Sequence, residues 1–299
     1  MADATNTCDV SSGSHFTLTA GVDWLSLSCA EDARGTALWR ALNDLMSSEE
    51  PMPSERKPWH IRAFSGSQTE SYALATDGQY VIGQLRGGQA EANWREMMRF
   101  AENVSRIDLQ VTVDASERYA GVAQKVYRSA LAGTNRGGRP PACALVVNSQ
   151  KGETAYIGRR TSDYFLRVYD KGVQSESALP GHLWRWEVEI KGLPAWHLAR
   201  TALTELWTPA KVASYVRRQF QLRGVEPSWE ASGEVSVAPV IKEHQDDRRS
   251  LEWLRQAVPY TMTRLVRHGF GAEVAQIVDG IPGLRAMLKA PGDVGDTQP

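Results

Sequence analysis

The sequence has few cysteines and no long apolar run. Its three cysteines are scattered and lack CxxC spacing, which argues against a disulfide framework and against a structural zinc site. No apolar run approaches the roughly 18–20 residues that a membrane span needs. The polar segment 1–14 has neither the basic start nor the apolar centre of a signal peptide. We therefore expect a cytoplasmic protein without a membrane partner.

Several catalytic signatures are also absent. None of the six histidines forms a His-x-His pair, which is the metal-binding pattern of one class of DNA-nicking enzymes. No GxxxxGK[ST] loop is present, so a P-loop NTPase is excluded, and no Gly-x-Ser-x-Gly elbow is present either. The sequence contains no internal repeat and no low-complexity tract, so repeat architectures are excluded as well.

The chain lacks a strong net charge. Its 34 Lys/Arg and 35 Asp/Glu give a formal charge of −1, which argues against a general basic coat for nucleic acid. Between Arg118 and Arg200, however, thirteen Lys/Arg stand against six Asp/Glu. This basic middle fits a local phosphate-binding surface. It fits an ordinary fluctuation of charge along the chain equally well.

Apolar residues are plentiful enough, at 42% of 299 residues, for a full core. Period-two alternation predicts strands at 16–19, 22–27, 70–75, 79–86, 106–114, 143–148, 154–160, 164–171 and 183–191. Helical spacing predicts helices at 36–47, 89–103, 116–131, 195–203 and 210–222. Early strands and late helices predict an α+β fold, with an antiparallel-rich central sheet, flanking helices and a helical C-terminal region.

The same patterns predict the domain organisation. We expect one α+β domain over 15–232 that carries the chemistry, followed by a helical C-terminal region over 240–290. A connector containing Pro, Gly and Ser lies at 225–240. Segments 1–14 and 289–299 are expected to be flexible tails.

One face of the predicted sheet collects the side chains that could carry chemistry. Alternation along three strands places the following residues on it: Asp108, Arg167, Tyr169, Lys171, Arg185, Glu187, Glu189 and Lys191. Carboxylates from different strands can hold Mg²⁺ or Mn²⁺. Arginine and lysine can orient a phosphodiester, and a tyrosine hydroxyl can attack its phosphorus. By residue type the face predicts a metal-assisted tyrosine transesterase.

A plainer interpretation fits the same residues. Sheets that face water on one side often carry alternating Lys, Arg and Glu that pair across strands. Tyrosine is common in strands without any catalytic role. A solvated sheet face of an unrelated α+β domain is therefore the alternative.

Four segments in register resemble the replication initiation factor family. They are Arg106-Ile-Asp-Leu, Tyr156-Ile-Gly-Arg-Arg, Arg167-Val-Tyr-Asp-Lys-Gly172 and Arg185-Trp-Glu-Val-Glu189. This family comprises rolling-circle initiators of plasmids and filamentous phages, with related relaxases of integrative elements. The resemblance extends over about residues 20–290, because Glu252-Trp253-Leu254 and Pro259 resemble the helical C-terminal part of the phage-type members.

The resemblance implies a specific reaction. Such proteins nick one DNA strand at an origin, form a 5′-phosphotyrosine link, leave a 3′-OH and later rejoin the ends. It implies that Tyr169 is the nucleophile, with Tyr164 a weaker candidate on the opposite face. Asp108 and Glu187, with Glu189 as a third ligand, would hold Mg²⁺ or Mn²⁺. The implied phosphate contacts are Arg167, Lys171 and Arg185.

Further basic residues are candidates for DNA binding. Arg136 and Arg139 belong to the basic loop 133–140, whose alternative is an ordinary surface loop. Arg159 and Arg160 follow in the Tyr-Ile-Gly-Arg-Arg segment, where Arg159 replaces the serine common in the family. Gln174 replaces a glutamate found in many members, which removes an acidic group near Tyr169.

Rival functions follow from the same residues. A DNA-binding replication or copy-control regulator of this fold would not cut, and Gln174 favours it. Tyr169, Asp108 and Glu187 together favour cutting. A conjugative relaxase would share the chemistry. The expected partner is origin DNA, single-stranded or in a hairpin at the nick site, and a host helicase and a second copy of the chain are further candidates.

Overall fold

The computed structural model describes residues 7–8, 16–51, 65–76, 78–115, 120–133, 139–148, 152–175, 182–229, 269 and 275. The chain divides into two units, Met1–Val240 and Ile241–Pro299. All elements discussed below belong to the first unit. The predicted C-terminal helices and the connector beyond residue 229 lie outside the described residues, as does nearly all of segment 1–14.

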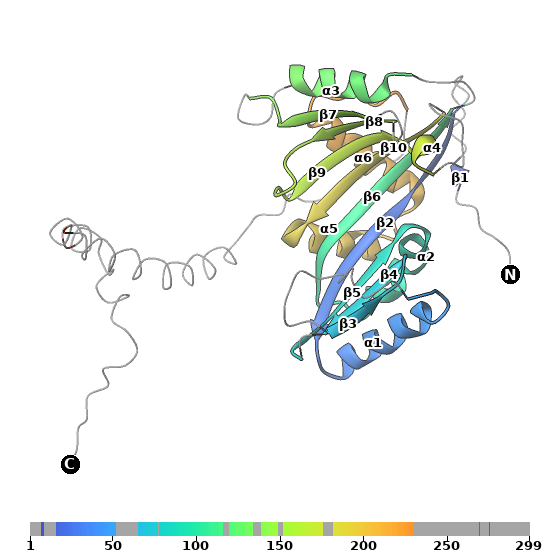
Figure 1. The fold of residues 1–299 in the computed structure, drawn as a ribbon, viewed down its shortest axis with the longest axis vertical. Coiled ribbons are helices and arrows are strands. Elements are labelled where there is room, and N and C mark those ends of the chain that lie inside the picture. Colours follow the sequence, from blue (N-terminus) through green and yellow to red (C-terminus); the bar gives the residue numbers. More distant parts are fainter. Residues whose placement is uncertain are drawn as a thin grey trace, which may run out of the picture. The chain divides into compact units, whose positions relative to one another are not determined.

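One antiparallel sheet forms the centre of the first unit, with the strand order β3-β4-β5-β2-β6-β10-β9-β8-β7 and with β1 paired to β2 (Figure 1). The strands are β1 (Thr7–Cys8), β2 (Phe16–Ala30), β3 (Ser65–Gln68), β4 (Tyr72–Thr76), β5 (Tyr80–Arg86), β6 (Asn103–Ala115), β7 (Cys143–Asn148), β8 (Gly152–Ile157), β9 (Tyr164–Asp170) and β10 (Leu183–Lys191). The helices are α1 (Ala33–Met46), α2 (Gly87–Met97), α3 (Val122–Ala132), α4 (Lys171–Ser175), α5 (Gly192–Thr204) and α6 (Pro209–Gln221). The predicted α+β class is confirmed.

The strands β2 and β6 are the longest and lie at the middle of the sheet. β2 pairs with β6 along Phe16–Ser28 and with β5 along Trp24–Ala30. The sequence predicted two separate strands, 16–19 and 22–27, and this division was wrong. A register shift between Val22 and Trp24 lets one strand continue with an extra residue on its side of the pair.

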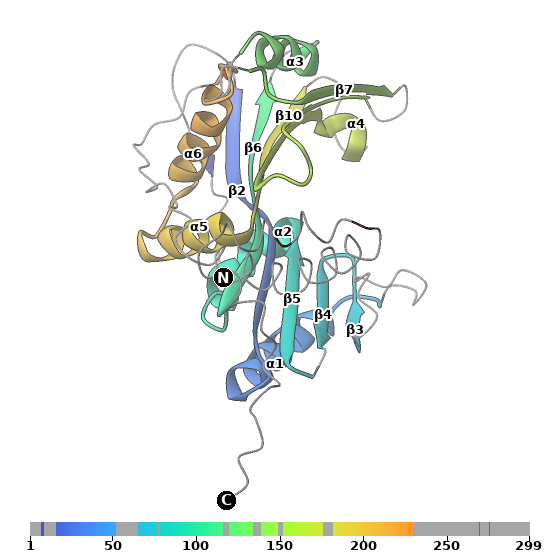
Figure 2. The same ribbon diagram turned by 90° about the vertical axis from the view of Figure 1, so that its left-hand side faces the viewer.

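The core lies on one face of this sheet. On β6 the alternating residues Ile107, Leu109, Val111 and Val113 are buried there. Trp186 of β10 packs edge-on against Phe220 of α6, with 4.9 Å between ring centroids. Figure 2 shows α5 and α6 on one side of β2 and β6, and α4 on the other. The intervening polar residues therefore point to the opposite face.

Some predicted boundaries were wrong for local reasons. The predicted helix 89–103 ends at Met97, and β6 begins at Asn103. β8 ends at Ile157, because Gly158 turns the chain with φ of +96°, so Arg159 and Arg160 lie in the turn before β9. β9 ends at Asp170, and Lys171 begins the short helix α4, which was not predicted.

In the part of the chain that the structure describes, no helix is long and apolar enough to cross a membrane.

Candidate active site on the polar face of the sheet

The register of three strands brings the predicted site residues together. Asp108 of β6 lies opposite Glu189 of β10. On the other side of β10, Arg167 lies opposite Glu187, and Tyr169 lies opposite Arg185. Residues opposite one another in a ladder share a face, so the structure places all of these side chains on the polar face. Tyr164 lies on the other face, opposite Ile190.

Tyr169 is buried at the centre of this face, with 8% of its surface exposed. Its hydroxyl donates a hydrogen bond of 2.5 Å to Oε1 of Glu187, which is itself 1% exposed. Burial, followed by the charge of Glu187, raises the pKa of Tyr169 well above its ordinary value. The residue is therefore a phenol at neutral pH, and Glu187 is the group placed to take its proton.

Arg167 joins Glu187 to Asp108. Its Nε donates to Oε2 of Glu187, and its Nη2 lies 3.4 Å from Oδ2 of Asp108. Both carboxylates lose their hydration in this position, so the guanidinium supplies the charge and hydrogen bonds that water no longer provides. The strand neighbours β6, β10 and β9 are thus linked through side chains as well as through their backbones.

Arg106 is a member of the site that the sequence analysis did not assign. Its Nε and Nη2 donate to the two oxygens of Asp108 at 2.8 and 2.5 Å, and Nη2 lies 3.0 Å from Oε2 of Glu189. Lys191 completes the cluster, with Nζ 2.6 Å from Oε1 of Glu189. The sequence could have indicated Arg106, because a residue two positions before Asp108 in a strand lies on the same face as Asp108.

A second group of charges surrounds Arg185. Its Nη1 lies 2.9 Å from Oδ1 of Asp23, and its Nε donates to the Thr112 hydroxyl at 3.0 Å. Nη1 is also 4.0 Å from Oε1 of Glu187, on the Tyr169 side of that carboxylate. Burial and then the charge of Arg185 lower the pKa of Lys171, so Lys171 lies within the electrostatic influence of Arg185.

The three predicted metal ligands are paired with cationic side chains in this arrangement. Asp108, Glu187 and Glu189 are suitable oxygen donors, but each is ion-paired with Arg106, Arg167 or Lys191. Within the described residues, no group of three or more His, Cys, Asp or Glu side chains is placed to hold a metal ion. Guanidinium and ammonium groups occupy the positions in which a cation would meet these carboxylates.

Of the four predicted DNA-binding arginines, the structure describes Arg139, Arg159 and Arg160. Arg139 and Arg159 line a pocket at another part of the sheet. Arg160 lies with its guanidinium 5.3 Å from the ring centre of Phe165. Arg136 falls outside the described residues, and so does the side chain of Gln174.

Comparison with known proteins supports the fold. No protein-family model matches the sequence, and no curated protein matches it. Among solved structures, the chain is similar to a rolling circle replication initiator protein from Geobacillus stearothermophilus, with 18% identity and a TM-score of 0.50. The match covers 67% of this chain and 84% of that one. The chain therefore has a fold similar to that of this protein.

The buried Asp108 carboxyl makes stability depend on pH. Burial raises its pKa to about 6, even though Arg106 and Arg167 act in the opposite direction. The folded chain therefore binds this proton more tightly than the unfolded chain, in which the pKa is 3.8. The stability that this proton contributes is present below about pH 4 and is lost as the pH rises through about 6.

Urea unfolding of the wild type and of Asp108→Asn, whose side chain does not titrate, measures this effect. From about pH 4.5 to about pH 7.5, we expect the unfolding free energy of the wild type minus that of the variant to fall by about 2 kcal/mol. A difference that rises over this range would show that the arginines dominate over burial.

Proposed function

We propose that this protein is a rolling-circle replication initiator that nicks and rejoins one DNA strand at an origin through a 5′-phosphotyrosine intermediate. The observation that carries the proposal is the Tyr169 hydroxyl, which lies 2.5 Å from the Glu187 carboxylate. Arg167, Arg185 and Lys171 stand around the same pair. A nucleophile, a proton acceptor and cations for a phosphate are thus combined.

The proposed reaction is a transesterification at phosphorus. Oη of Tyr169 attacks the phosphodiester while its proton passes to Oε1 of Glu187. The new Tyr–O–P bond retains the 5′ side, and the bond to the 3′ oxygen breaks. That oxygen takes a proton from solvent and leaves as the 3′-OH. The Arg167 and Arg185 guanidinium groups stabilise the charge that grows on the non-bridging oxygens, and rejoining reverses these steps.

Two independent lines support DNA as the partner. The fold is similar to that of a replication initiator protein. The family-like segments containing Asp108, Arg167, Tyr169 and Glu187 converge on one face. A relaxase would use the same face, whereas a regulator would bind the origin without using Tyr169 as a nucleophile.

The first test compares Tyr169→Phe with Tyr164→Phe on supercoiled plasmid carrying the element's own origin. We expect the wild type and Tyr164→Phe to produce nicked circles with protein bound to the 5′ end after denaturation. Tyr169→Phe removes the attacking oxygen, so both nicking and the adduct should disappear. Tight origin binding by a wild type that never nicks would favour the regulator, and nicking by Tyr169→Phe would refute this nucleophile.

The second test concerns the proton acceptor. Glu187→Gln keeps the shape but removes the base, so we expect the nicking rate to fall by about 10²–10⁴-fold. The remaining rate should rise more steeply with pH than that of the wild type, because solvent must then accept the phenol proton. Glu205→Gln, at the end of α5, is the matched control and should nick normally. A pH profile parallel to that of the wild type would contradict the role of Glu187.

The use of Mg²⁺ or Mn²⁺ is a separate proposal. For Asp108, Glu187 and Glu189 to hold such an ion, their pairs with Arg106, Arg167 and Lys191 must first open. Metal binding and ion pairing therefore compete for the same oxygens. Weakening one pair should strengthen metal binding.

Lys191→Gln tests this competition, because Lys191 is the most exposed of the three cations. Its removal frees Oε1 of Glu189, and we expect Mn²⁺ to bind about two- to fivefold more tightly in calorimetry, the range that a partly exposed pair contributes. Lys211→Gln, which breaks the surface pair with Glu205, is the control. If Mn²⁺ binds neither the wild type nor Lys191→Gln, the metal proposal is wrong.

A further inference from the structure

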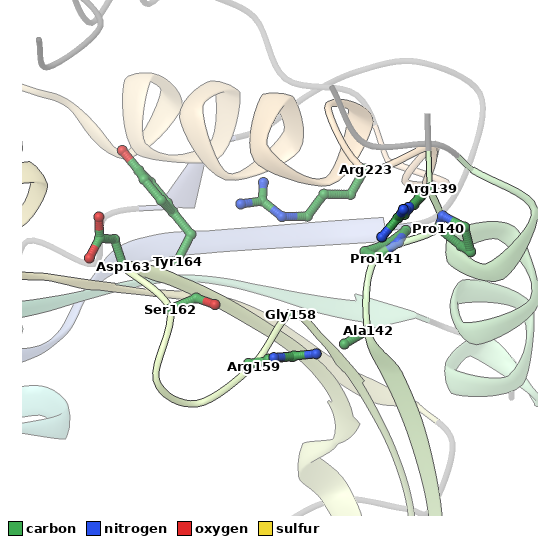
Figure 3. Close-up of a pocket in the computed structure, with 10 residues that line it drawn as sticks. All are labelled: Arg139, Pro140, Pro141, Ala142, Gly158, Arg159, Ser162, Asp163, Tyr164 and Arg223. Atoms are coloured by element: carbon green, nitrogen blue, oxygen red, sulfur yellow. The ribbon is translucent and has the colours of Figure 1, made fainter. Parts of the chain in front are cut away.

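A second basic site lies away from Tyr169. It is a cavity of about 560 Å³ between the start of β9, the β8–β9 turn, the segment before β7 and the end of α6 (Figure 3). Tyr164 lines it, five residues before Tyr169 and on the opposite face of β9. Five strand residues correspond to about 17 Å, so the cavity is separate from the candidate active site.

Arginines from three separate segments surround this cavity. They are Arg139 before β7, Arg159 in the β8–β9 turn and Arg223 after α6. Figure 3 shows them on different sides of the space, with Asp163 beside Tyr164. Asp163 is the one carboxylate residue among those that line the cavity. The residues that line the cavity therefore carry a surplus of positive charge, which favours an anion. Guanidinium groups bind phosphate oxygens particularly well.

Arg223 is the most informative of the three. Burial lowers the pKa of its guanidinium, because removing a positive charge from water disfavours the charged form. Its Nη1 donates to the Gln219 carbonyl at 2.7 Å and to Gln219 Oε1 at 3.1 Å. Its Cζ lies 5.6 Å from the ring centre of Tyr164. Among the residues that the structure describes, no carboxylate forms an ion pair with Arg223. An anion in the cavity would supply the missing opposite charge.

The walls of the cavity are held in place by close backbone contacts. The Gly158 amide donates to the Ala142 carbonyl at 2.7 Å, which ties the turn to the segment before β7. A Cβ on Gly224 would lie 2.7 Å from the Cα of Gly133, so the chain after α6 packs directly against the end of α3. The cavity is therefore already formed without a ligand, which lowers the cost of binding one.

We propose that this cavity binds one nucleotide of single-stranded DNA, with its phosphate between the arginines and its base against Tyr164. The identity of the strand rests on the proposed function. The volume is that of a small-ligand site, and aromatic side chains hold single-stranded bases by stacking. A base-paired nucleotide cannot enter such a concave site without leaving its duplex. A free nucleotide shares the same chemistry and has to be distinguished by experiment.

The binding test uses Tyr169→Phe as the parent, so that no strand is cut, with a fluorescent oligothymidine as the probe. The pocket variant adds Arg139→Gln and Arg159→Gln, and the matched control adds Arg40→Gln and Arg99→Gln, two exposed arginines elsewhere. Each phosphate contact on a single strand contributes about 0.7 to the slope of log affinity against log salt. Because the proposed site holds one phosphate, we expect the pocket variant to lose about 0.7 from this slope, and the control to keep the parent value.

Two further arms complete the test. An oligonucleotide with 5-iododeoxyuridine should photo-crosslink to the peptide containing Tyr164, and the crosslink should be lost in the pocket variant. Thymidine monophosphate should displace the oligonucleotide only at far higher concentration. Displacement at equal concentration would overturn the assignment to DNA and identify a free nucleotide as the ligand.

The outcomes separate this inference from the proposed function. If the wild type does not nick but the pocket variant still loses oligothymidine binding, the nicking proposal fails and the nucleotide site stands. If the wild type nicks but the pocket variant binds with the affinity and salt slope of the control, the nucleotide site is wrong.

Discussion

The buried charge network between β6, β10 and β9 is the interaction on which the candidate site depends. Asp108, Glu187 and Glu189 are each at most 1% exposed, and an ionised carboxylate so far from water requires cations in contact with it. Arg106, Arg167 and Lys191 provide that contact. Because removing a cation leaves a charged carboxylate buried without its partner, the register of the three strands and the positions of these side chains stabilise one another.

The same network sets the state of the tyrosine. Glu187 accepts hydrogen bonds from both Arg167 and Tyr169, so the carboxylate that neutralises the guanidinium also orients the phenol. Under the nicking proposal, a DNA phosphate that enters this face would meet guanidinium groups already bound to carboxylates. Binding of the phosphate and release of the carboxylates are therefore coupled, and a divalent cation would depend on that release. This physical link connects the nicking proposal with the metal proposal.

Much of this arrangement could be predicted from the sequence, because period-two alternation is a local property. The bounds of β10 were predicted correctly at 183–191, and alternation placed Tyr169 and Glu187 on one face. Alternation cannot reveal register, so the contacts of Arg167 with Glu187 and Asp108, which lie on other strands, were not predicted. The register shift at Asp23 of β2 and the approach of Arg223 to Tyr164 also depend on tertiary packing. No short sequence pattern encodes such packing.

The most direct measurement of the central claim is peptide mapping of the covalent adduct. The wild type is incubated with a single-stranded oligonucleotide that carries the origin nick site, then digested with protease and nuclease, and the modified peptide is sequenced by mass spectrometry. The account predicts a 5′-nucleotide phosphodiester on Tyr169, absent from Tyr169→Phe and present in Tyr164→Phe. An adduct on another residue, or cleavage of the oligonucleotide without any adduct, would contradict it.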